Sequence, residues 1–236
     1  MEAGLPGNNR CVFLIQARLF SSRLPGKILF NFFGDTIIER IIKITKKITN
    51  RKNIFIVTGN KKKNKILENI AKKNQIKIFF GDEERVLFRF RNLLKSKSME
   101  KYDYVYRLTA DNYLIQPKII KIMLTDTFKN EIDYGYVMPL SHYAGEIISK
   151  KLFFKNYKFS KKALEHVTWD FRKNKNIKIS KYPKNFLGLN HTESICLDTI
   201  EDLIKLKNIE IDYPKLKNID NYNYLKKIEN ELLYNR

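Results

Sequence analysis

The feature that most constrains the fold is a series of short, nearly apolar segments that alternate with amphipathic ones. The segments 11–15, 53–58, 76–80 and 102–109 are rich in Val, Ile, Phe and Tyr, which is typical of strands buried on both faces of a sheet. Between them, apolar residues recur at helical spacing, as in 37–48, where Thr36 can cap the helix. This alternation predicts parallel βαβ units, and therefore an α/β fold in which helices cover both faces of a mostly parallel sheet.

The length of the chain fits one such domain. We expect residues 11–236 to form it, and residues 1–10, which have no apolar core, to be a flexible N-terminal extension rather than a secretory signal. No apolar run approaches the ~20 residues that span a bilayer, so we expect no membrane partner. Cys11 and Cys196 lie in apolar segments, which indicates reduced core residues and a cytoplasmic protein.

The formal net charge of +21 is the strongest compositional signal. Such an excess would suit nucleic acid or an anionic membrane surface. The lysines, however, are spread along the whole chain among many Asn and Ile residues and do not form one compact arm. This distribution disfavours nucleic acid as a partner, while part of the charge would serve a polyanionic substrate such as a nucleoside triphosphate.

A basic loop, residues 16–27, follows the first apolar segment directly. Arg18 and Lys27 could bind phosphate oxygens, Arg as a planar fork and Lys as a mobile charge. Ser21 and Ser22 add short donors, and Pro25-Gly26 turns the chain so that Lys27 points back. Neither the Walker spacing nor Gly-x-Gly-x-x-Gly is present. A loop of this kind at the end of a buried strand predicts a phosphate site.

The same loop carries a family resemblance. Gln16-Ala17-Arg18, followed by Ser21-Ser22-Arg23-Leu24-Pro25-Gly26-Lys27, resembles the opening signature of the CTP-dependent cytidylyltransferases, which include the CMP-Kdo and CMP-sialic acid synthetases. The branch named after spore-coat polysaccharide biosynthesis protein F is the most similar. The resemblance implies a Rossmann-like three-layer sandwich that binds CTP and Mg²⁺. It also implies nucleotide contacts by Gln16, Ala17, Arg18, Ser21, Ser22, Arg23 and Lys27, with catalytic roles for Arg18 and Lys27.

A second similarity lies in the segment 81–90. It resembles the family's Gly-acidic-acidic-Val-Leu-x-Arg motif, which implies that Arg89 binds the nucleotide near the cytosine and ribose. A purely structural reading is also open, in which the acids at 82–84 complement the dipole of a helix in its first turn.

Two aspartates stand out as candidate metal ligands. Asp111 follows the segment 102–109 and would face the basic loop, where Mg²⁺ could bind one or two carboxylates together with phosphate oxygens. Alternatively, Asp111 caps the turn before the helix that begins at Pro117. The stretch 107–117 resembles the family's second landmark, which implies that Thr109 and Ala110 contact the nucleotide and that Asp111 is catalytic and binds the metal.

The stretch 195–203 resembles the family's third landmark, an apolar strand followed by Asp-Thr-x-Glu-Asp-Leu. Thr199 and Asp202 are spaced as a capping pair, which leaves Asp198 at the strand end without a capping duty. The resemblance implies that Asp198 joins Asp111 at the Mg²⁺ ion.

The segment 139–183 corresponds to the part that relatives insert for acceptor binding and dimerisation. The resemblance implies that Glu146 and His166 contact the acceptor and that the chain forms a homodimer. His166 could instead be a helix histidine bonded to a backbone carbonyl.

The resemblance as a whole implies transfer of CMP from CTP to an acidic sugar or phosphorylated acceptor, with release of pyrophosphate, for surface polysaccharide or glycoconjugate biosynthesis. Two alternatives remain: a glycosyltransferase that uses a nucleotide sugar, and a basic module that binds nucleic acid or anions without catalysis. Phe20 raises a further question, because a ring pointing into the loop would change the choice of nucleotide.

Overall fold

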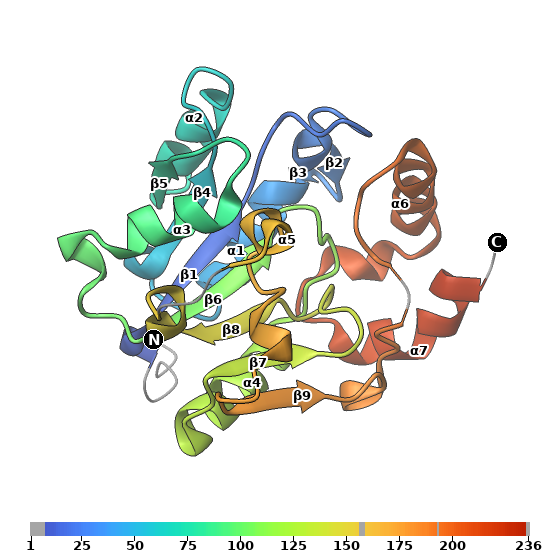
Figure 1. Cartoon of the computed structure of the whole chain (residues 1–236). Coiled ribbons are helices and arrows are strands. Elements are labelled where there is room, and N and C mark those ends of the chain that lie inside the picture. The colour runs from blue at the N-terminus through green and yellow to red at the C-terminus, as the bar shows by residue number, and fades with distance from the viewer. Residues whose placement is uncertain (1–7, 156–158, 193, 235–236) are drawn as a thin grey trace.

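The computed structural model describes residues 8–155, 159–192 and 194–234 (Figure 1). Its main sheet has seven strands in the order β5-β4-β1-β6-β8-β7-β9, and within it only β8 runs antiparallel to its neighbours. The predicted mostly parallel sheet is therefore confirmed. The strand bounds are β1 Cys11–Gln16, β4 Ile54–Thr58, β5 Lys77–Phe80, β6 Tyr104–Thr109, β7 Tyr134–Val137, β8 Glu146–Ser149 and β9 Ile179–Tyr182.

Helices and short turns of helix connect these strands. The α-helices are α1 Ile37–Lys46, α2 Ile66–Lys73, α3 Val86–Leu94, α4 Pro117–Asn130, α5 Lys161–Glu165, α6 Ile200–Asp212 and α7 Tyr222–Tyr234. Short 3₁₀ helices lie at Asn8–Arg10, Lys27–Leu29, Arg51–Asn53, Lys97–Met99, Lys150–Phe153, Phe171–Lys173, Phe186–Gly188 and Pro214–Lys217. A small hairpin of β2 Asn31–Phe32 and β3 Asp35–Thr36 precedes α1.

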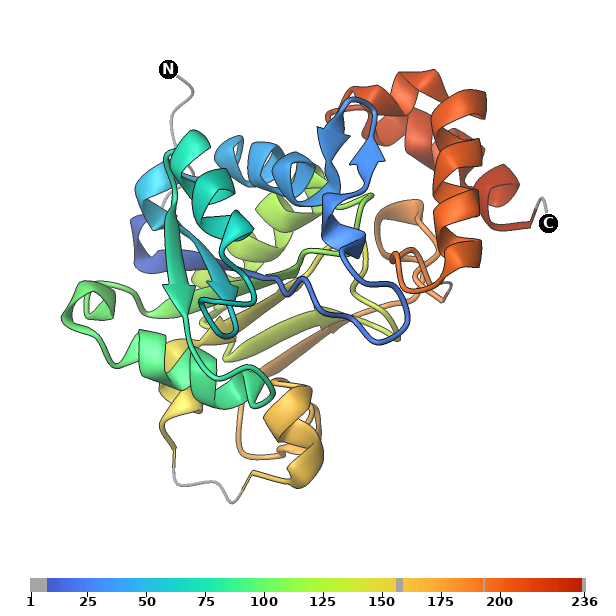
Figure 2. The same ribbon diagram turned by 90° about the horizontal axis from the view of Figure 1, so that it is seen from above.

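Two apolar cores lie on the two faces of the sheet. Side chains alternate along β1, so that Cys11, Phe13 and Ile15 belong to one core and Val12 and Leu14 to the other. The first core is covered by α1, α2 and α4 together with α6 and α7, and the second by α3 and the region of α5 (Figure 2). The predicted three-layer arrangement is confirmed.

Both predicted helix caps are present. Thr36 and Glu39 form a reciprocal capping box at the start of α1, and Thr199 and Asp202 form another at the start of α6. Two local predictions are wrong. Residues 194–198 form a loop instead of a strand, and α3 begins only at Val86, so the acids at 82–84 precede the helix.

The segment 139–183 contributes directly to the sheet. Strand β8 lies between β6 and β7, and β9 extends the sheet beyond β7. The boundaries predicted for this segment, and its part in dimerisation, stay predictions. Both cysteines are buried and free, as predicted.

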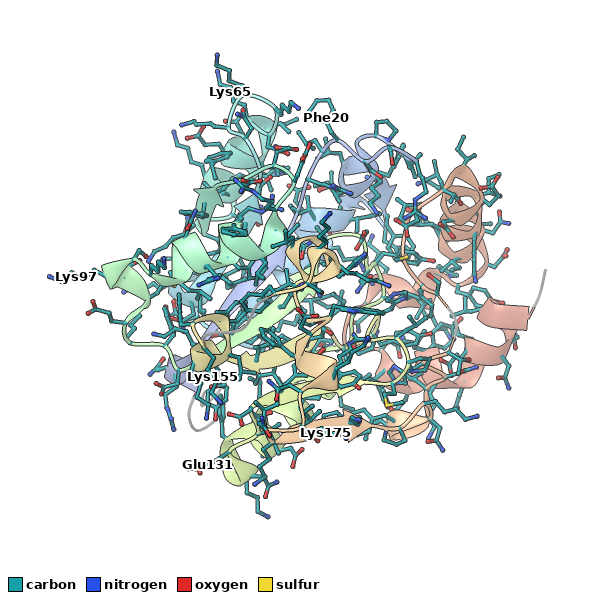
Figure 3. All side chains as sticks on the ribbon, viewed as in Figure 1. Phe20, Lys65, Lys97, Glu131, Lys155 and Lys175 are labelled. Carbon is teal, nitrogen blue, oxygen red and sulfur yellow. The ribbon has the colours of Figure 1, made fainter. Side chains whose placement is uncertain are left out.

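None of the helices in the described part of the chain is long and apolar enough to cross a bilayer. The lysine side chains labelled in Figure 3, at 65, 97, 155 and 175, lie in separate parts of the molecule, consistent with a charge that is dispersed over it.

The sheet topology places a ligand site beyond β1 and β6. Strand β1 has β4 on one side and β6 on the other, so the direction of strand addition reverses between β1 and β6. In open α/β sheets, ligands bind at such a switch point, outside the carboxyl ends of the strands. The basic loop and Asp111 leave the sheet at these ends.

Candidate active site

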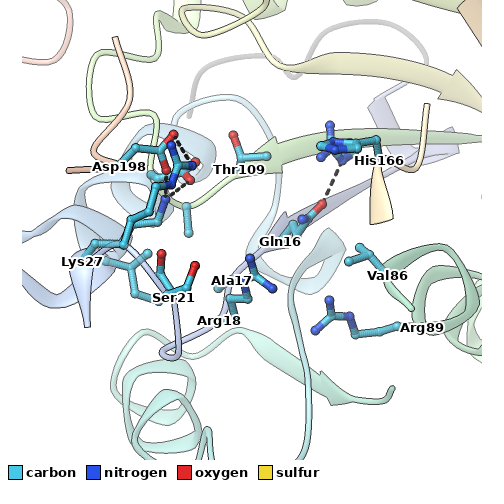
Figure 4. A pocket seen from close by; sticks show the side chains of 16 residues that line it. Gln16, Ala17, Arg18, Ser21, Lys27, Val86, Arg89, Thr109, His166 and Asp198 are labelled. Carbon is cyan, nitrogen blue, oxygen red and sulfur yellow. Dashed lines mark hydrogen bonds and ion pairs between the residues drawn. The ribbon is translucent and has the colours of Figure 1, made fainter. Parts of the chain in front are cut away.

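A cavity of about 410 Å³ lies beyond the ends of β1 and β6. Its lining includes every residue that the sequence predicts to bind the nucleotide, namely Gln16, Ala17, Arg18, Ser21, Ser22, Arg23, Lys27, Arg89, Thr109 and Ala110. Asp111, Asp198 and His166 also line it. Figure 4 shows Lys27, Ser21 and Asp198 at one end of this nucleotide cavity and Val86, Arg89 and His166 at the other. The structure therefore brings these residues together, while their binding roles stay predictions.

The basic loop is folded back on itself by backbone contacts. Gly26 has a positive φ of 71°, a conformation that favours glycine, and its N–H donates to the carbonyl of Leu19 at 2.7 Å. The N–H of Leu19 in turn donates to Oδ1 of Asn64 at 3.0 Å. This fold places Lys27, which directly follows the turn, inside the cavity with only 7% of its surface exposed.

Lys27 lies between the two predicted metal ligands. Its Nζ is 2.5 Å from Oδ2 of Asp111 and 2.6 Å from Oδ1 of Asp198. Burial alone would lower the pKa of Lys27, but the two carboxylates outweigh it and raise the pKa. Burial would likewise raise the pKa of Asp198, but Lys27, with a smaller effect of Arg23, lowers it. Arg23 is 3.0 Å from the other oxygen of Asp198.

Asp111 and Asp198, the two partners of Lys27, come from different parts of the fold. Asp111 follows β6, whereas Asp198 belongs to the loop that precedes α6. The N–H of Leu197 donates to the carbonyl of Asp111 at 3.0 Å, and the N–H of Asp198 donates to Asp202 at 2.9 Å. Asp198 is thus positioned by a backbone hydrogen bond of its neighbour Leu197 and by the cap of α6, and not by the strand that we expected here.

The donor set fits Mg²⁺. One ammonium group contacts an oxygen of both Asp111 and Asp198, so both carboxylates can face one cation. Mg²⁺ typically takes one or two carboxylates and completes its octahedron with substrate phosphates and waters. The described residues contain no cluster of three or more acidic, His or Cys side chains suited to a metal.

Arg89 is a buried cation, and part of its guanidinium group has no hydrogen-bond partner among the described residues. It is 1% exposed, and its Nε and Nη1 atoms are buried without a hydrogen-bond partner in the described structure. Burial lowers the pKa of Arg89 to about 10. Gly81 makes room for it, since a Cβ at that position would lie 2.9 Å from Cγ of Arg89. Unpaired buried donors are costly, and a ligand in the cavity could supply acceptors for those of Arg89.

The ring of Phe20 does not enter the nucleotide cavity. It is 57% exposed and lies with Nζ of Lys63 about 6.0 Å from its centroid, and it is not among the lining residues (Figure 3). The possibility that this ring changes the choice of nucleotide from inside the loop is therefore not supported.

A second cavity of about 260 Å³ adjoins the first. The two share Arg107, Thr109, Asp111 and Asp198 as lining residues. Glu146, predicted to contact the acceptor, lines this acceptor cavity, but its carboxylate already accepts hydrogen bonds from four side chains. A direct contact between Glu146 and an acceptor stays a prediction.

His166 lies at the mouth of the nucleotide cavity. It directly follows α5, its side chain is exposed, and no described residue forms a hydrogen bond with its ring. The alternative in which its ring is bonded to a backbone carbonyl is therefore not supported. Its contact with an acceptor stays a prediction.

Two arginines and a histidine among the lining residues were not singled out from the sequence. Arg107 and Arg172 line the acceptor cavity, and so does His142. The Nδ1 atom of His142 accepts a hydrogen bond from the N–H of Ile195 at 3.0 Å, and burial lowers the pKa of His142, so the neutral ring carries its proton on Nε2. The position of Arg107 in the 107–117 motif was a usable signal, whereas nothing local marks Arg172 or His142.

Comparison with known proteins finds relatives for nearly the whole chain. The profile of a family described as cytidylyltransferase matches residues 12–234. Spore coat polysaccharide biosynthesis protein SpsF from Bacillus subtilis (strain 168) is 34% identical over 150 residues, which are 61% of this chain and 61% of that protein. The chain thus aligns with about three fifths of the length of this curated relative.

Solved structures agree with this assignment. A cytidylyltransferase from Leptospira borgpetersenii serovar Hardjo-bovis (strain JB197) is similar with a TM-score of 0.80 and 26% identity, covering 96% of this chain and 98% of that one. CMP:2-keto-3-deoxy-manno-octonic acid synthetase, complexed with CTP, has a TM-score of 0.64 at 15% identity, covering 86% and 98%, and shares the fold.

Proposed function

The chain belongs to the cytidylyltransferase family, as its motifs predicted, and from that premise we propose that it transfers CMP from CTP to an acidic sugar or phosphorylated acceptor. Pyrophosphate is the second product. Such a reaction would serve the synthesis of surface polysaccharides or other glycoconjugates, in line with the name of the Bacillus relative.

The observation that carries this proposal is the shared wall between the two cavities. CTP occupies the larger cavity and the acceptor the smaller one, so the two substrates meet at Thr109, Asp111 and Asp198. A reaction between two bound molecules is accelerated when the protein holds the reacting atoms next to each other. The two predicted metal ligands lie at this meeting point.

The reaction exchanges one phosphorus–oxygen bond for another. An oxygen of the acceptor attacks the α-phosphorus of CTP, a bond forms between them, and the bond from that phosphorus to the pyrophosphate oxygen breaks. If the attacking group is a hydroxyl, its proton passes to water. Negative charge accumulates on the equatorial oxygens and on the leaving pyrophosphate.

The chain's own cations are placed to stabilise that charge. Arg18 and Lys27 neutralise oxygens around the α-phosphate, and Ser21, Ser22 and Arg23 position the β- and γ-phosphates. Arg89, at the other end of the nucleotide cavity, donates its unpaired N–H groups to the cytosine or ribose.

Asp111 and Asp198 would hold Mg²⁺, which supplies charge neutralisation at the phosphates and lowers the pKa of an acceptor hydroxyl. Lys27 lies between these two carboxylates. With a triphosphate bound, the ammonium of Lys27 would donate to the phosphate oxygens, and both carboxylates would be available to the cation.

Isothermal titration with CTP, UTP, ATP and GTP in the presence of Mg²⁺ tests the nucleotide assignment first. We expect CTP to bind most tightly, and Arg89→Met to weaken CTP binding. A pyrophosphate-release assay with a panel of sugar acids and sugar phosphates then tests transfer. Equal binding of all four nucleotides would refute the proposal, and release of a nucleotide from a nucleotide sugar instead of pyrophosphate from CTP would favour a glycosyltransferase.

A further inference from the structure

Glu146 is a buried carboxylate whose oxygens are fully engaged. It is 2% exposed, and Oε1 accepts hydrogen bonds from Tyr134 at 2.6 Å and from Arg172 at 2.7 Å. Oε2 accepts from Arg107 at 2.7 Å, and the hydroxyl of Thr168 lies 3.1 and 3.2 Å from the two oxygens. Burial alone would raise the pKa of Glu146, but the two arginines lower it to about 2. The group is ionised, and its two oxygens already accept hydrogen bonds from four side chains.

The two arginines are not saturated. Arg107 donates from Nε to Gln16 at 3.0 Å and from Nη1 to Glu146, and Arg172 donates from Nε to Tyr134 at 3.1 Å and from Nη2 to Glu146. Because a guanidinium carries five N–H groups, Nη2 of Arg107 and Nη1 of Arg172 donate to no described residue. Neither atom is among the buried polar atoms that lack a partner, so both are accessible. The two arginines and Glu146 together carry one net positive charge.

Both arginines line the acceptor cavity: Arg107 belongs to the wall shared with the nucleotide cavity, and Arg172 does not line the nucleotide cavity. The same arginines also line a further opening of about 330 Å³, with Lys162, His166, Thr168 and Trp169, and among the described side chains no carboxylate lines it. Nζ of Lys162 lies 3.5 Å from the centroid of the Trp169 ring. The acceptor cavity thus has Asp111, Asp198 and Arg107 on the wall shared with the nucleotide cavity, and Arg172 outside that wall.

The backbone fixes the position of this pair of arginines. Arg107 and Glu146 are directly opposite each other in the antiparallel pairing of β6 and β8. Gly145 has a positive φ of 73°, and a Cβ there would lie 2.6 Å from the carbonyl oxygen of Arg107. Arg172 comes from the 3₁₀ helix Phe171–Lys173, more than 60 residues after Arg107 in the chain. The positions of Arg107 and Arg172 are therefore set by the fold.

We propose that Arg107 and Arg172 bind an oxyanionic group of the acceptor, a carboxylate or a phosphate, and that Glu146 acts through them as a positioning residue. This inference rests on the proposed function, because it assigns the acceptor to the smaller cavity. The oxyanion binds to the two arginines, and the attacking oxygen of the acceptor is directed toward Asp111 and Asp198. A guanidinium pair suits this task because its planar forks match the oxygens of either anion.

Acetate and inorganic phosphate are the probes that test this proposal: acetate stands for a carboxylate of the acceptor, and inorganic phosphate for a phosphate. The full chain is saturated with Mg²⁺ and a CTP analogue that has a methylene bridge between the α- and β-phosphorus atoms. Each anion is then titrated while the ¹⁵N resonances of the arginine Nε–H groups are followed. We expect saturable shifts for Arg107 and Arg172 with at least one anion, and the anion that binds identifies the group on the acceptor.

Arg172→Met and Arg172→Lys are the test variants, and Arg51→Met is the matched control. Arg51 is an exposed arginine in the 3₁₀ helix that precedes β4, at the opposite edge of the sheet from the cavities. We expect binding of the anion to weaken about tenfold or more in Arg172→Met, less in Arg172→Lys, and not at all in the control.

Binding of the CTP analogue, measured by calorimetry on the same samples, separates the two proposals. Unchanged nucleotide affinity in the Arg172 variants shows that they are folded. Absence of saturable binding by either anion in the wild type, or equal binding by Arg172→Met, would overturn the inference while leaving the CTP assignment intact. Failure of the wild type to bind the CTP analogue would instead count against the proposed function.

Discussion

Replacing Glu146 by Gln tests how strongly the buried carboxylate supports the fold. The ordinary pKa of a glutamate is 4.5, and in this chain the pKa of Glu146 falls to about 2. A difference of about 2.5 in pKa corresponds to about 3 kcal/mol in the free energy of unfolding. This agrees with the loss of about 3–5 kcal/mol that is typical when one partner of a buried ion pair is removed.

The pH dependence follows from the direction of the shift. Because the folded chain holds Glu146 ionised more strongly than the unfolded chain does, the stabilisation is complete above the ordinary pKa of 4.5. It is lost as the pH falls from that value through about 2. The difference between wild type and Glu146→Gln should therefore be constant near neutral pH and shrink below about pH 4.5.

Urea denaturation at several pH values between 7 and 3 measures this difference. Glu68→Gln is the matched control, because Glu68 forms an exposed ion pair with Lys61 and should change the free energy of unfolding by less than about 1 kcal/mol. A value for Glu146→Gln within about 0.5 kcal/mol of the wild type at pH 7, or a difference that does not depend on pH, would contradict the reasoning.

Three further predictions concern the nucleotide cavity. Arg89→Met should weaken CTP binding but leave the free energy of unfolding unchanged or raise it, because Nε and Nη1 of Arg89 are buried without partners; a loss of stability without a loss of affinity in calorimetry would be inconsistent with a ligand role. Gly81→Ala should weaken CTP binding in the same titration by displacing Arg89, since the new Cβ would lie 2.9 Å from its Cγ. Lys27→Met should slow pyrophosphate release by roughly 10²–10³-fold, because Lys27 lines the nucleotide cavity. Phe20→Ala should leave the preference for CTP over UTP unchanged, because the ring of Phe20 is exposed. A normal rate in Lys27→Met together with an altered nucleotide preference in Phe20→Ala would argue against the assigned positions of both side chains.

The fold could be predicted from the sequence because its signals are local. Four apolar segments separated by helical periodicity were sufficient for a parallel sheet, and Thr36 and Thr199 marked the starts of α1 and α6. The loop at 194–198 was mistaken for a strand, since a short apolar run does not reveal whether a neighbouring strand is available to pair with it.

The nucleotide cavity was predictable for a similar reason. Its residues follow the ends of strands, and parallel strands bring their carboxyl ends to one edge of the sheet. The motifs at 16–27 and 107–117 therefore named residues that meet in space. The sequence could not show that Lys27 lies between Asp111 and Asp198, because the approach of Asp198 depends on a loop whose path is set by tertiary contacts.

By itself, then, the sequence determined the layers of the molecule and the basic, hydroxyl-bearing character of one loop, since periodicity and strand-end chemistry are properties of short segments. Only the tertiary structure decided that Glu146 is an anchor for Arg107 and Arg172. A cross-strand pair between β6 and β8 and a 3₁₀ helix far along the chain create that cluster. Whether a buried carboxylate binds a ligand or holds other side chains depends on which donors fold around it, and those donors come from segments that are distant in sequence.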